Sequence, residues 1–152
     1  MTVYLVRHGK AGSRSASTEP DDLRTLTKAG RRQAEALADM LEGSGIERII
    51  SSPYVRCRQT VEPLAERLRL PVDLADALAE GAPLADVLAL LDKVGDDDTV
   101  LCTHGDVVSE LLQHCVRHGV AVDSGLLAKG SIWVLETEAD AVVSAEYVPP
   151  PV

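Results

Sequence analysis

Short apolar runs alternate along this chain with segments that have a helical apolar period. Residues 3–6, 47–51 and 99–105 contain the runs, which are short enough for buried strands. A longer segment with apolar residues three and four apart follows each of them. This alternation predicts an α/β fold whose central sheet is mainly parallel.

The helical segments are predicted from their apolar stripes and end signals. Residues 28–42 form the first helix, with Thr27 as its N-cap and Gly43 and Gly45 after its end. Residues 53–68 form the second, where Pro63 is expected to produce a kink. Two shorter helices follow, at 84–91 and after His104. Runs 130–136 and 141–147 predict an antiparallel hairpin that turns at 138–140.

Composition supports one domain with an aliphatic core. The chain has 152 residues with no Phe, one Trp and three Tyr, so its core must be built from Leu, Val, Ile and Ala. We predict a single domain over residues 1–148 and a proline-rich tail over 149–152. No apolar stretch reaches the ~18 residues of a membrane span. Three cysteines without a CxxC pattern indicate reduced thiols, and together with the absence of a leader they predict a cytoplasmic location.

Charge is unevenly distributed along the chain. The net charge is −9, but residues 1–60 carry ten Lys or Arg against seven Asp or Glu, whereas residues 61–152 carry five against seventeen. An acidic total argues against a nucleic-acid-binding surface, which depends on many basic side chains. The basic first part therefore needs a local explanation.

Three basic motifs follow the three predicted strands. Arg7-His8-Gly9-Lys10 follows the first, Ser51-Ser52-Pro53-Tyr54-Val55-Arg56-Cys57-Arg58-Gln59-Thr60 the second, and His104-Gly105 ends the third. Each motif alone is more often a surface ion pair or a structural histidine. Ligands of parallel sheets bind at the carboxyl ends of the strands, so we predict that Arg7, His8, Arg56 and His104 meet in one pocket.

These motifs resemble the histidine phosphatase superfamily, also called the phosphoglycerate mutase-like family, over about residues 3–112. The spacing from Arg7-His8-Gly9-Lys10-Ala11 to Leu26-Thr27-Lys28-Ala29-Gly30 is similar to that of the small bacterial phosphohistidine phosphatases. The resemblance implies a three-layer α/β/α sandwich. It also implies a phosphatase that transfers a phosphoryl group to a histidine, with no metal or other cofactor.

The resemblance assigns the roles of the site residues. His8 is expected to be the nucleophile, with one ring nitrogen donating to a backbone carbonyl and the other attacking phosphorus. Arg7, Arg56 and His104 are expected to bind the phosphoryl oxygens together with Gly9, and their charge to lower the pKa of His8. Arg14, in the polar loop 11–23, could close over the phosphate. Arg58 lies about 200° from Arg56 on a helix, so we expect it to face elsewhere.

The general acid is left open between Glu80, Asp106 and no residue at all. Larger relatives use a carboxylic acid from the region of Glu80, whereas some acid phosphatases place a donor just after the second histidine, at Asp106 here. Asp106 could equally cap the helix that follows. The small phosphohistidine phosphatases manage without such an acid, and an imidazole leaving group needs less protonation than an alkoxide.

The short segment 71–98 predicts an open site. The mutases of this family insert a larger cap there, and an open site favours hydrolysis because water reaches the phosphohistidine. We expect a phosphorylated small molecule or a phosphohistidine-bearing protein as substrate, with protein phosphohistidine, phosphate esters and nucleotides all open. Two alternatives stand beside the phosphatase: a phosphomutase and a noncatalytic module that binds a phosphorylated ligand.

Overall fold

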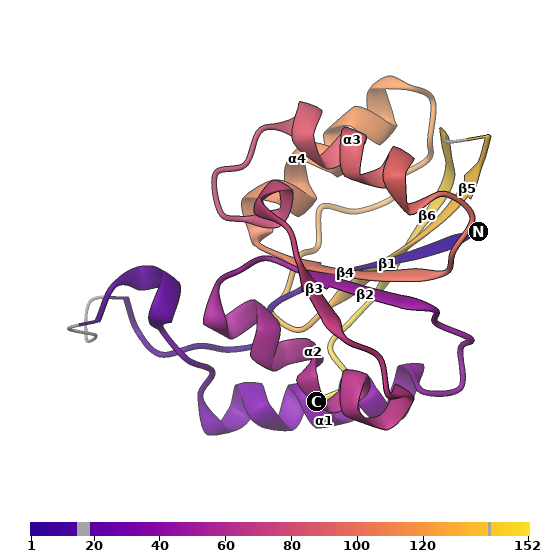
Figure 1. The fold of residues 1–152 in the computed structure, drawn as a ribbon. Helices are drawn as coiled ribbons and strands as arrows, with labels where there is room; N and C mark the ends of the chain where they lie inside the picture. The colour runs from indigo at the N-terminus through magenta and orange to yellow at the C-terminus, as the bar shows by residue number, and fades with distance from the viewer. Residues whose placement is uncertain (15–18, 140) are drawn as a thin grey trace.

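The computed structural model describes residues 1–14, 19–139 and 141–152 and builds them around one six-stranded sheet (Figure 1). Its strands are β1 (Thr2–Arg7), β2 (Arg48–Ser51), β3 (Val72–Leu74), β4 (Thr99–Thr103), β5 (Ile132–Glu138) and β6 (Ala141–Val148), in the order β3-β2-β4-β1-β5-β6. The first four in this order run parallel, and β5 and β6 are antiparallel additions. The predicted α/β fold with a mainly parallel sheet is confirmed.

Helices cover both faces of the sheet, which gives the three layers expected. The helices are α1 (Lys28–Leu41), α2 (Val55–Leu68), α3 (Leu84–Val94) and α4 (Gly105–Arg117), with two 3-10 turns, η1 (Asp21–Leu23) and η2 (Asp76–Leu78). In Figure 1, α1 and α2 lie on one side of the sheet, and α3 and α4 lie on the other.

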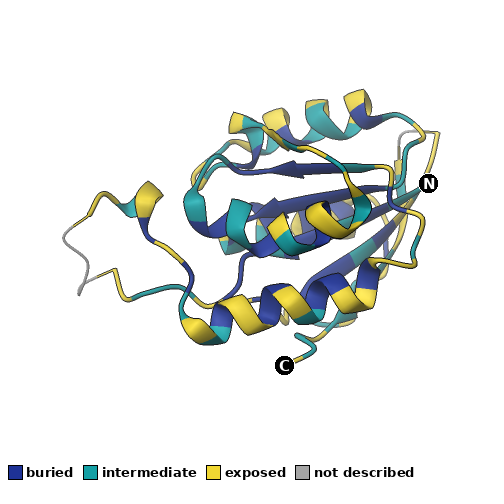
Figure 2. Cartoon of the chain, turned by 60° about the horizontal axis from the view of Figure 1, so that its bottom comes forward, coloured by how far each residue is buried: buried dark blue, intermediate teal, exposed yellow. Residues whose placement is uncertain are grey.

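The core is divided by the sheet into two apolar clusters, because successive strand side chains point to opposite faces. Val3 and Leu5 of β1 pack with Leu111 of α4, whereas Val6 packs with Leu37 of α1. Strands β1, β2 and β4 are largely buried, whereas the edge strands β3 and β6 are more exposed, and the helices expose their outer faces (Figure 2). The Leu, Val, Ile and Ala core expected from the composition is present, with Trp133 as its one large aromatic residue among those described.

Parallel pairing brings the ends of three strands together. Arg7 at the end of β1 pairs with Thr103 at the end of β4, and Ser51 at the end of β2 pairs with Cys102 of β4. The three motifs that follow these strands therefore leave the sheet at the same edge. This geometry positions the site.

Most predicted elements are present with small shifts of their ends. Helix α1 begins after Thr27, whose hydroxyl accepts a hydrogen bond from Gly30 N–H at 3.1 Å, as an N-cap does. Helix α2 begins at Val55 rather than 53, because Tyr54 is extended, and it continues through Pro63 to Leu68. A kink at Pro63 stays a prediction.

The hairpin is antiparallel as predicted, but β5 begins at Ile132 rather than at 130. Residue 140 of its turn lies outside the described residues. The short edge strand β3 was not predicted, because it has three residues and two of them are exposed, so no apolar alternation marks it. In the predicted polar loop 11–23, residues 21–23 form η1, and residues 15–18 lie outside the described part of the chain.

Candidate active site

A cavity of about 300 Å³ lies at the carboxyl ends of β1, β2 and β4. It is lined by Arg7, His8, Arg14, Arg24, Arg56, Glu80, His104, Gly105, Asp106, Leu127 and Lys129. The structure thus brings together the four basic residues that the motifs singled out, although they are spread over almost one hundred positions of sequence. Arg58, which was expected to face elsewhere, does not line this cavity.

His8 is held in one tautomer by its backbone surroundings. Its Nδ1 lies 2.8 Å from the carbonyl oxygen of Gly9, so Nδ1 carries the proton and donates it. The other ring nitrogen, Nε2, accepts a hydrogen bond from Arg56 Nε at 3.3 Å. A guanidinium only donates, so Nε2 has its lone pair exposed to the cationic side of the cavity. This is the arrangement expected for a nucleophilic imidazole.

The neutral form of His8 is strongly favoured. Burial lowers its pKa most, and the charges of Arg56, His104 and Arg7 lower it further, so that the pKa falls to about 3 despite the opposing hydrogen bond to Gly9. The predicted direction is therefore correct. However, the main cause is desolvation rather than the neighbouring cations, because the side chain is only 6% exposed.

Arg56 is the central cation of the cavity, and its side chain is 1% exposed. Besides the bond to His8, its terminal nitrogens donate to the backbone oxygen of Asp21 at 2.8 Å and to the Asp21 carboxylate at 3.1 Å. The Glu80 carboxylate lies 3.6 Å away. Arg56 therefore links the nucleophile to two acidic residues at the mouth of the site.

His104 is the N-cap residue of α4 and is 2% exposed. Its Nε2 lies 2.9 Å from Ser52 Oγ, and its ring packs edge-on against Tyr54. Its centroid lies 5.4 Å from that of His8. Its Nδ1 is buried and has no hydrogen-bond partner among the described residues, and Arg7 Nε is in the same situation. Two orphaned polar atoms on cavity-lining residues indicate a site that binds a polar ligand.

Arg7 packs directly on the first turn of α4. It donates to the carbonyl oxygen of Leu127, and a Cβ at Gly105 would lie 3.0 Å from its guanidinium carbon. The glycine of the His104-Gly105 motif therefore makes room for Arg7. The free N–H groups of a helix start also face anions favourably, so α4 adds to the positive potential.

Gly9 was expected to bind substrate, but the structure does not place it in the cavity. Its N–H donates to Thr60 Oγ1 at 3.0 Å, and Thr60 in turn donates to the carbonyl oxygen of Arg56 at 2.7 Å. A Cβ at Gly9 would lie 3.1 Å from Gln33 Oε1 and from the oxygen of Gly30. Gly9 therefore allows close packing and ties His8 to Arg56.

Both candidate acids, Glu80 and Asp106, line the cavity, so the geometry keeps both open. Glu80 accepts a hydrogen bond from Arg14 at 3.0 Å, which places this loop arginine at the site mouth. Asp106 accepts one from Gly81 N–H at 2.8 Å, which ties the first turn of α4 to the turn that carries Glu80. Asp106 was also considered as a helix cap, but α4 receives no side-chain cap.

Three charged residues of the site were missed by sequence reasoning. The Asp21 carboxylate bonds Arg14, Arg24 and Arg56, and these hydrogen bonds and charges outweigh the opposing effect of its burial, so that its pKa falls to about 2. Arg24 and Lys129 line the cavity directly. The spacing of Asp21 three residues before Arg24 is a local signal that could have found that pair. No sequence signal marks Lys129.

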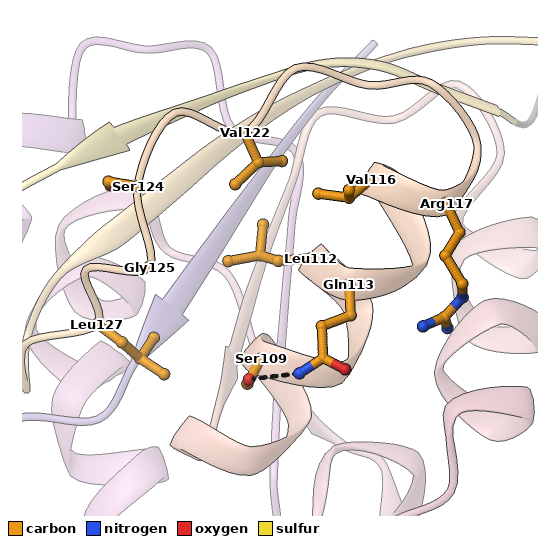
Figure 3. A pocket seen from close by; sticks show the side chains of 9 residues that line it. All are labelled: Ser109, Leu112, Gln113, Val116, Arg117, Val122, Ser124, Gly125 and Leu127. Carbon is orange, nitrogen blue, oxygen red and sulfur yellow. Dashed lines mark hydrogen bonds between the residues drawn. The ribbon is translucent and has the colours of Figure 1, made fainter.

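A second cavity, of about 520 Å³, lies between α4 and the loop 122–127 (Figure 3). Leu127 lines both cavities. Leu112, Val116 and Val122 give the second cavity an apolar floor, while Ser109 and Gln113, which are hydrogen-bonded at 3.3 Å, lie at its edge.

Comparison with known proteins places the chain in a family. The model of the histidine phosphatase superfamily (branch 1) matches residues 3–82, which is more than half of the chain. This chain belongs to the histidine phosphatase superfamily. The matched region holds the Arg7-His8-Gly9 motif and Arg56, and the cavity adds His104 from the part beyond it.

Two curated proteins are similar to this chain in sequence. The 8-oxo-(d)GTP phosphatase of Mycolicibacterium smegmatis is 40% identical over 99% of this chain and 48% of its own length. Phosphohistidine phosphatase SixA of Escherichia coli is 38% identical over 57% of this chain and 53% of its own length. The chain thus spans about half the length of each of these relatives.

The fold itself matches the solved structures of two phosphatases. The structure of the protein histidine phosphatase SixA complexed with tungstate superposes with a TM-score of 0.80, at 22% identity, over 99% of this chain and 97% of that one. A mycobacterial glucosyl-3-phosphoglycerate phosphatase superposes with a TM-score of 0.72 over 96% of both chains, at 19% identity. These likenesses establish the three-layer architecture.

In the part of the chain that the structure describes, none of the helices is long and apolar enough to cross a membrane. Within the same residues, no group of three or more His, Cys, Asp or Glu side chains is arranged to hold a metal ion.

Proposed function

We propose that this protein is a metal-independent phosphatase that transfers a phosphoryl group from its substrate to His8 and then to water. The observation that carries the proposal is the state of His8: a neutral imidazole whose Nδ1 proton is held by Gly9, and whose Nε2 faces Arg56 in a cavity with four arginines. Arginine side chains can neutralise a phosphoryl dianion, so the chemistry proposed needs no metal ion.

In the first step, His8 Nε2 forms a bond to phosphorus as the bond from phosphorus to the leaving atom breaks. The leaving atom keeps the electron pair and takes up a proton. Arg56 Nε exchanges its bond to Nε2 for one to a phosphoryl oxygen as the substrate enters, while Arg7 Nε and His104 Nδ1 use their open positions for the same group. These donors stabilise the charge of the transition state.

In the second step, water attacks the phosphorus of phosphohistidine. The water loses a proton, the nitrogen–phosphorus bond breaks, and His8 regains its lone pair as orthophosphate forms. Glu80 and Asp106 both lie at the cavity, and either can donate a proton to the leaving group in the first step and accept one from water in the second. An imidazole or phosphate leaving group needs little of this help.

The substrate is proposed from two relatives. SixA, a phosphohistidine phosphatase, supports protein phosphohistidine, whereas the 8-oxo-(d)GTP phosphatase, which aligns over nearly the whole chain, supports a nucleotide. The three buried, unpaired cysteines suit the reducing cytoplasm, where both kinds of substrate occur.

The test is to trap the intermediate. The protein is mixed with a radiolabelled phosphodonor such as acetyl phosphate, quenched in alkali and digested, and the acid-labile label is mapped. We expect it on His8, and we expect none in His8→Asn, with orthophosphate release lost in that variant. EDTA is expected to leave the wild-type rate unchanged.

The alternatives give different results in the same experiments. A noncatalytic binding module retains no label on His8 although it binds the donor. A phosphomutase converts 3-phosphoglycerate into its isomer, which mass-spectrometric product analysis detects. Residues 71–98 here form β3, η2 and α3, elements of the sheet and its helical layer, which favours hydrolysis over mutase chemistry. Isomer formation would overturn this proposal.

A further inference from the structure

The cavity cations differ in how their charge is compensated. Arg14, Arg24 and Arg56 each have a carboxylate oxygen within 4 Å, from Asp21 or Glu80. Among the described residues that line the cavity, Arg7 and Lys129 are the cations without such a partner. Arg7 is already needed for the transferred phosphoryl group. Lys129 is therefore an additional positive charge that has no role in the proposed phosphoryl transfer to His8.

The backbone of Lys129 is fixed to the segment that carries His8. Gly130 N–H donates to the carbonyl oxygens of Arg7 and His8, at 3.1 and 3.0 Å. The buried amide of Gln33 bridges both segments, since its Oε1 accepts from Lys10 N–H at 2.8 Å and its Nε2 donates to the carbonyl oxygen of Lys129 at 3.0 Å. Lys129 is thus held at a set place beside the nucleophile.

The surroundings of Lys129 are strongly cationic. Partial burial lowers the pKa of its ammonium group, and the charges of Arg7, Arg24, Arg56 and Arg14 lower it further. Five cationic side chains that line one cavity repel one another, and a bound anion would reduce that repulsion. An anion next to the transferred phosphoryl group would relieve this repulsion.

The size of the cavity leaves room for such an anion. Its volume of about 300 Å³ is more than one phosphoryl group fills. A phosphate monoester brings two negative charges, whereas a diphosphate brings a third on the neighbouring phosphate. Lys129 is placed to match that extra charge.

We propose that Lys129 forms a second anion subsite that binds the phosphate adjacent to the one transferred to His8. The substrates favoured are then phosphoanhydrides such as nucleoside diphosphates, in which the leaving group is itself a phosphate. This inference rests on the proposed function of His8 and names its substrate class. With such a substrate the leaving group needs little protonation from Glu80 or Asp106, because a leaving phosphate is a weak base.

The test compares two phosphonates that cannot be hydrolysed, measured by titration calorimetry. Methylenediphosphonate carries two adjacent phosphonate groups, and methylphosphonate carries one. We expect the wild-type protein to bind the first roughly tenfold more tightly than the second, the gain from one added charge-assisted contact. Lys129→Met is expected to reduce this preference to below about threefold.

Two variants serve as controls. Lys129→Arg retains the charge and is expected to keep the preference. Lys93→Met removes a lysine of α3 that does not line the cavity, and is expected to leave the preference unchanged. Equal binding of the two phosphonates by the wild-type protein overturns the inference, as does an equal loss for both in Lys129→Met. A preserved preference without phosphohistidine on His8 would reject the catalytic proposal alone.

Discussion

Arg56 shows how much one side chain determines at the residue scale. Its Nε contacts His8, and its terminal nitrogens contact Asp21 through both the backbone and the carboxylate. This use of separate N–H groups in one plane is specific to a guanidinium, because a lysine ammonium is a compact charge without a fork. The position therefore requires arginine and not only a positive charge.

We predict that Arg56→Lys lowers kcat by roughly 100-fold or more, because a donor aimed at the developing charge is lost. Arg58→Lys is the matched control: it lies on the same helix, two residues on, and does not line the cavity. It is expected to keep kcat within about twofold, the modest effect typical of changes away from the site. Steady-state kinetics with p-nitrophenyl phosphate measures both, and circular dichroism verifies folding. An Arg56→Lys enzyme with more than a tenth of the wild-type kcat would contradict the role assigned to the guanidinium group of Arg56.

At the scale of elements, the start of α1 is pressed against the loop that carries the nucleophile. A Cβ at Gly30 would lie 2.0 Å from the carbonyl oxygen of Lys10, much closer than a carbon can approach an oxygen to which it is not bonded. Thr27 N–H donates to the same oxygen at 2.9 Å. Helix α1 thus supports the His8 loop through its backbone, and Gly30 is the residue that permits the contact.

We predict that Gly30→Ala destabilises the fold by about 2 kcal/mol or more and weakens catalysis, because backbone must move to admit the methyl group. Gly43→Ala, just past the end of the same helix, has no atom within 4 Å of the new Cβ and is expected to change stability by less than about 0.5 kcal/mol. Urea denaturation gives both values. Equal free energies of unfolding for the two variants would show that the loop at Lys10 moves to admit the methyl group without destabilising the fold.

At the scale of the whole molecule, the fold keeps an ionisable group neutral by enclosing it. His8 directly follows β1, and its neighbours Arg56 and His104 come from α2 and the start of α4, so only the assembled sheet edge buries it. In the unfolded chain, His8 has the ordinary histidine pKa of about 6.5, whereas in the folded protein the pKa falls to about 3. Folding is therefore linked to proton binding at this residue.

Between pH 6.5 and 3 the unfolded chain binds a proton at His8 that the folded protein does not bind. We therefore predict that the free energy of unfolding decreases as the pH falls through this window, by at most about 1.4 kcal/mol per pH unit from His8. His8→Asn lacks this contribution, so its stability is expected to depend less steeply on pH between 6.5 and 4.5. Urea denaturation over that range measures both slopes. Identical slopes would mean that the folded protein does protonate His8.

The sequence alone determined the fold class and the core of the site. The apolar periods of the strands and helices are local properties, and the motifs after β1, β2 and β4 sit at strand ends, where parallel pairing brings Arg7, His8, Arg56 and His104 together. The hairpin of β5 and β6 followed from the same alternation. The extent of the domain over residues 1–148 stays a prediction.

Only the tertiary structure decided which other charges complete the site. Asp21 comes from the short 3-10 turn η1 and bonds Arg56, which lies 35 residues away. Lys129 lines the same cavity as Arg7, which lies more than 120 residues away, and no apolar periodicity marks either position. The use of Gly9 N–H by Thr60 and the main role of burial in the pKa of His8 likewise depend on packing. Such contacts depend on the positions of whole elements, and a linear pattern encodes only the local preferences from which those elements form.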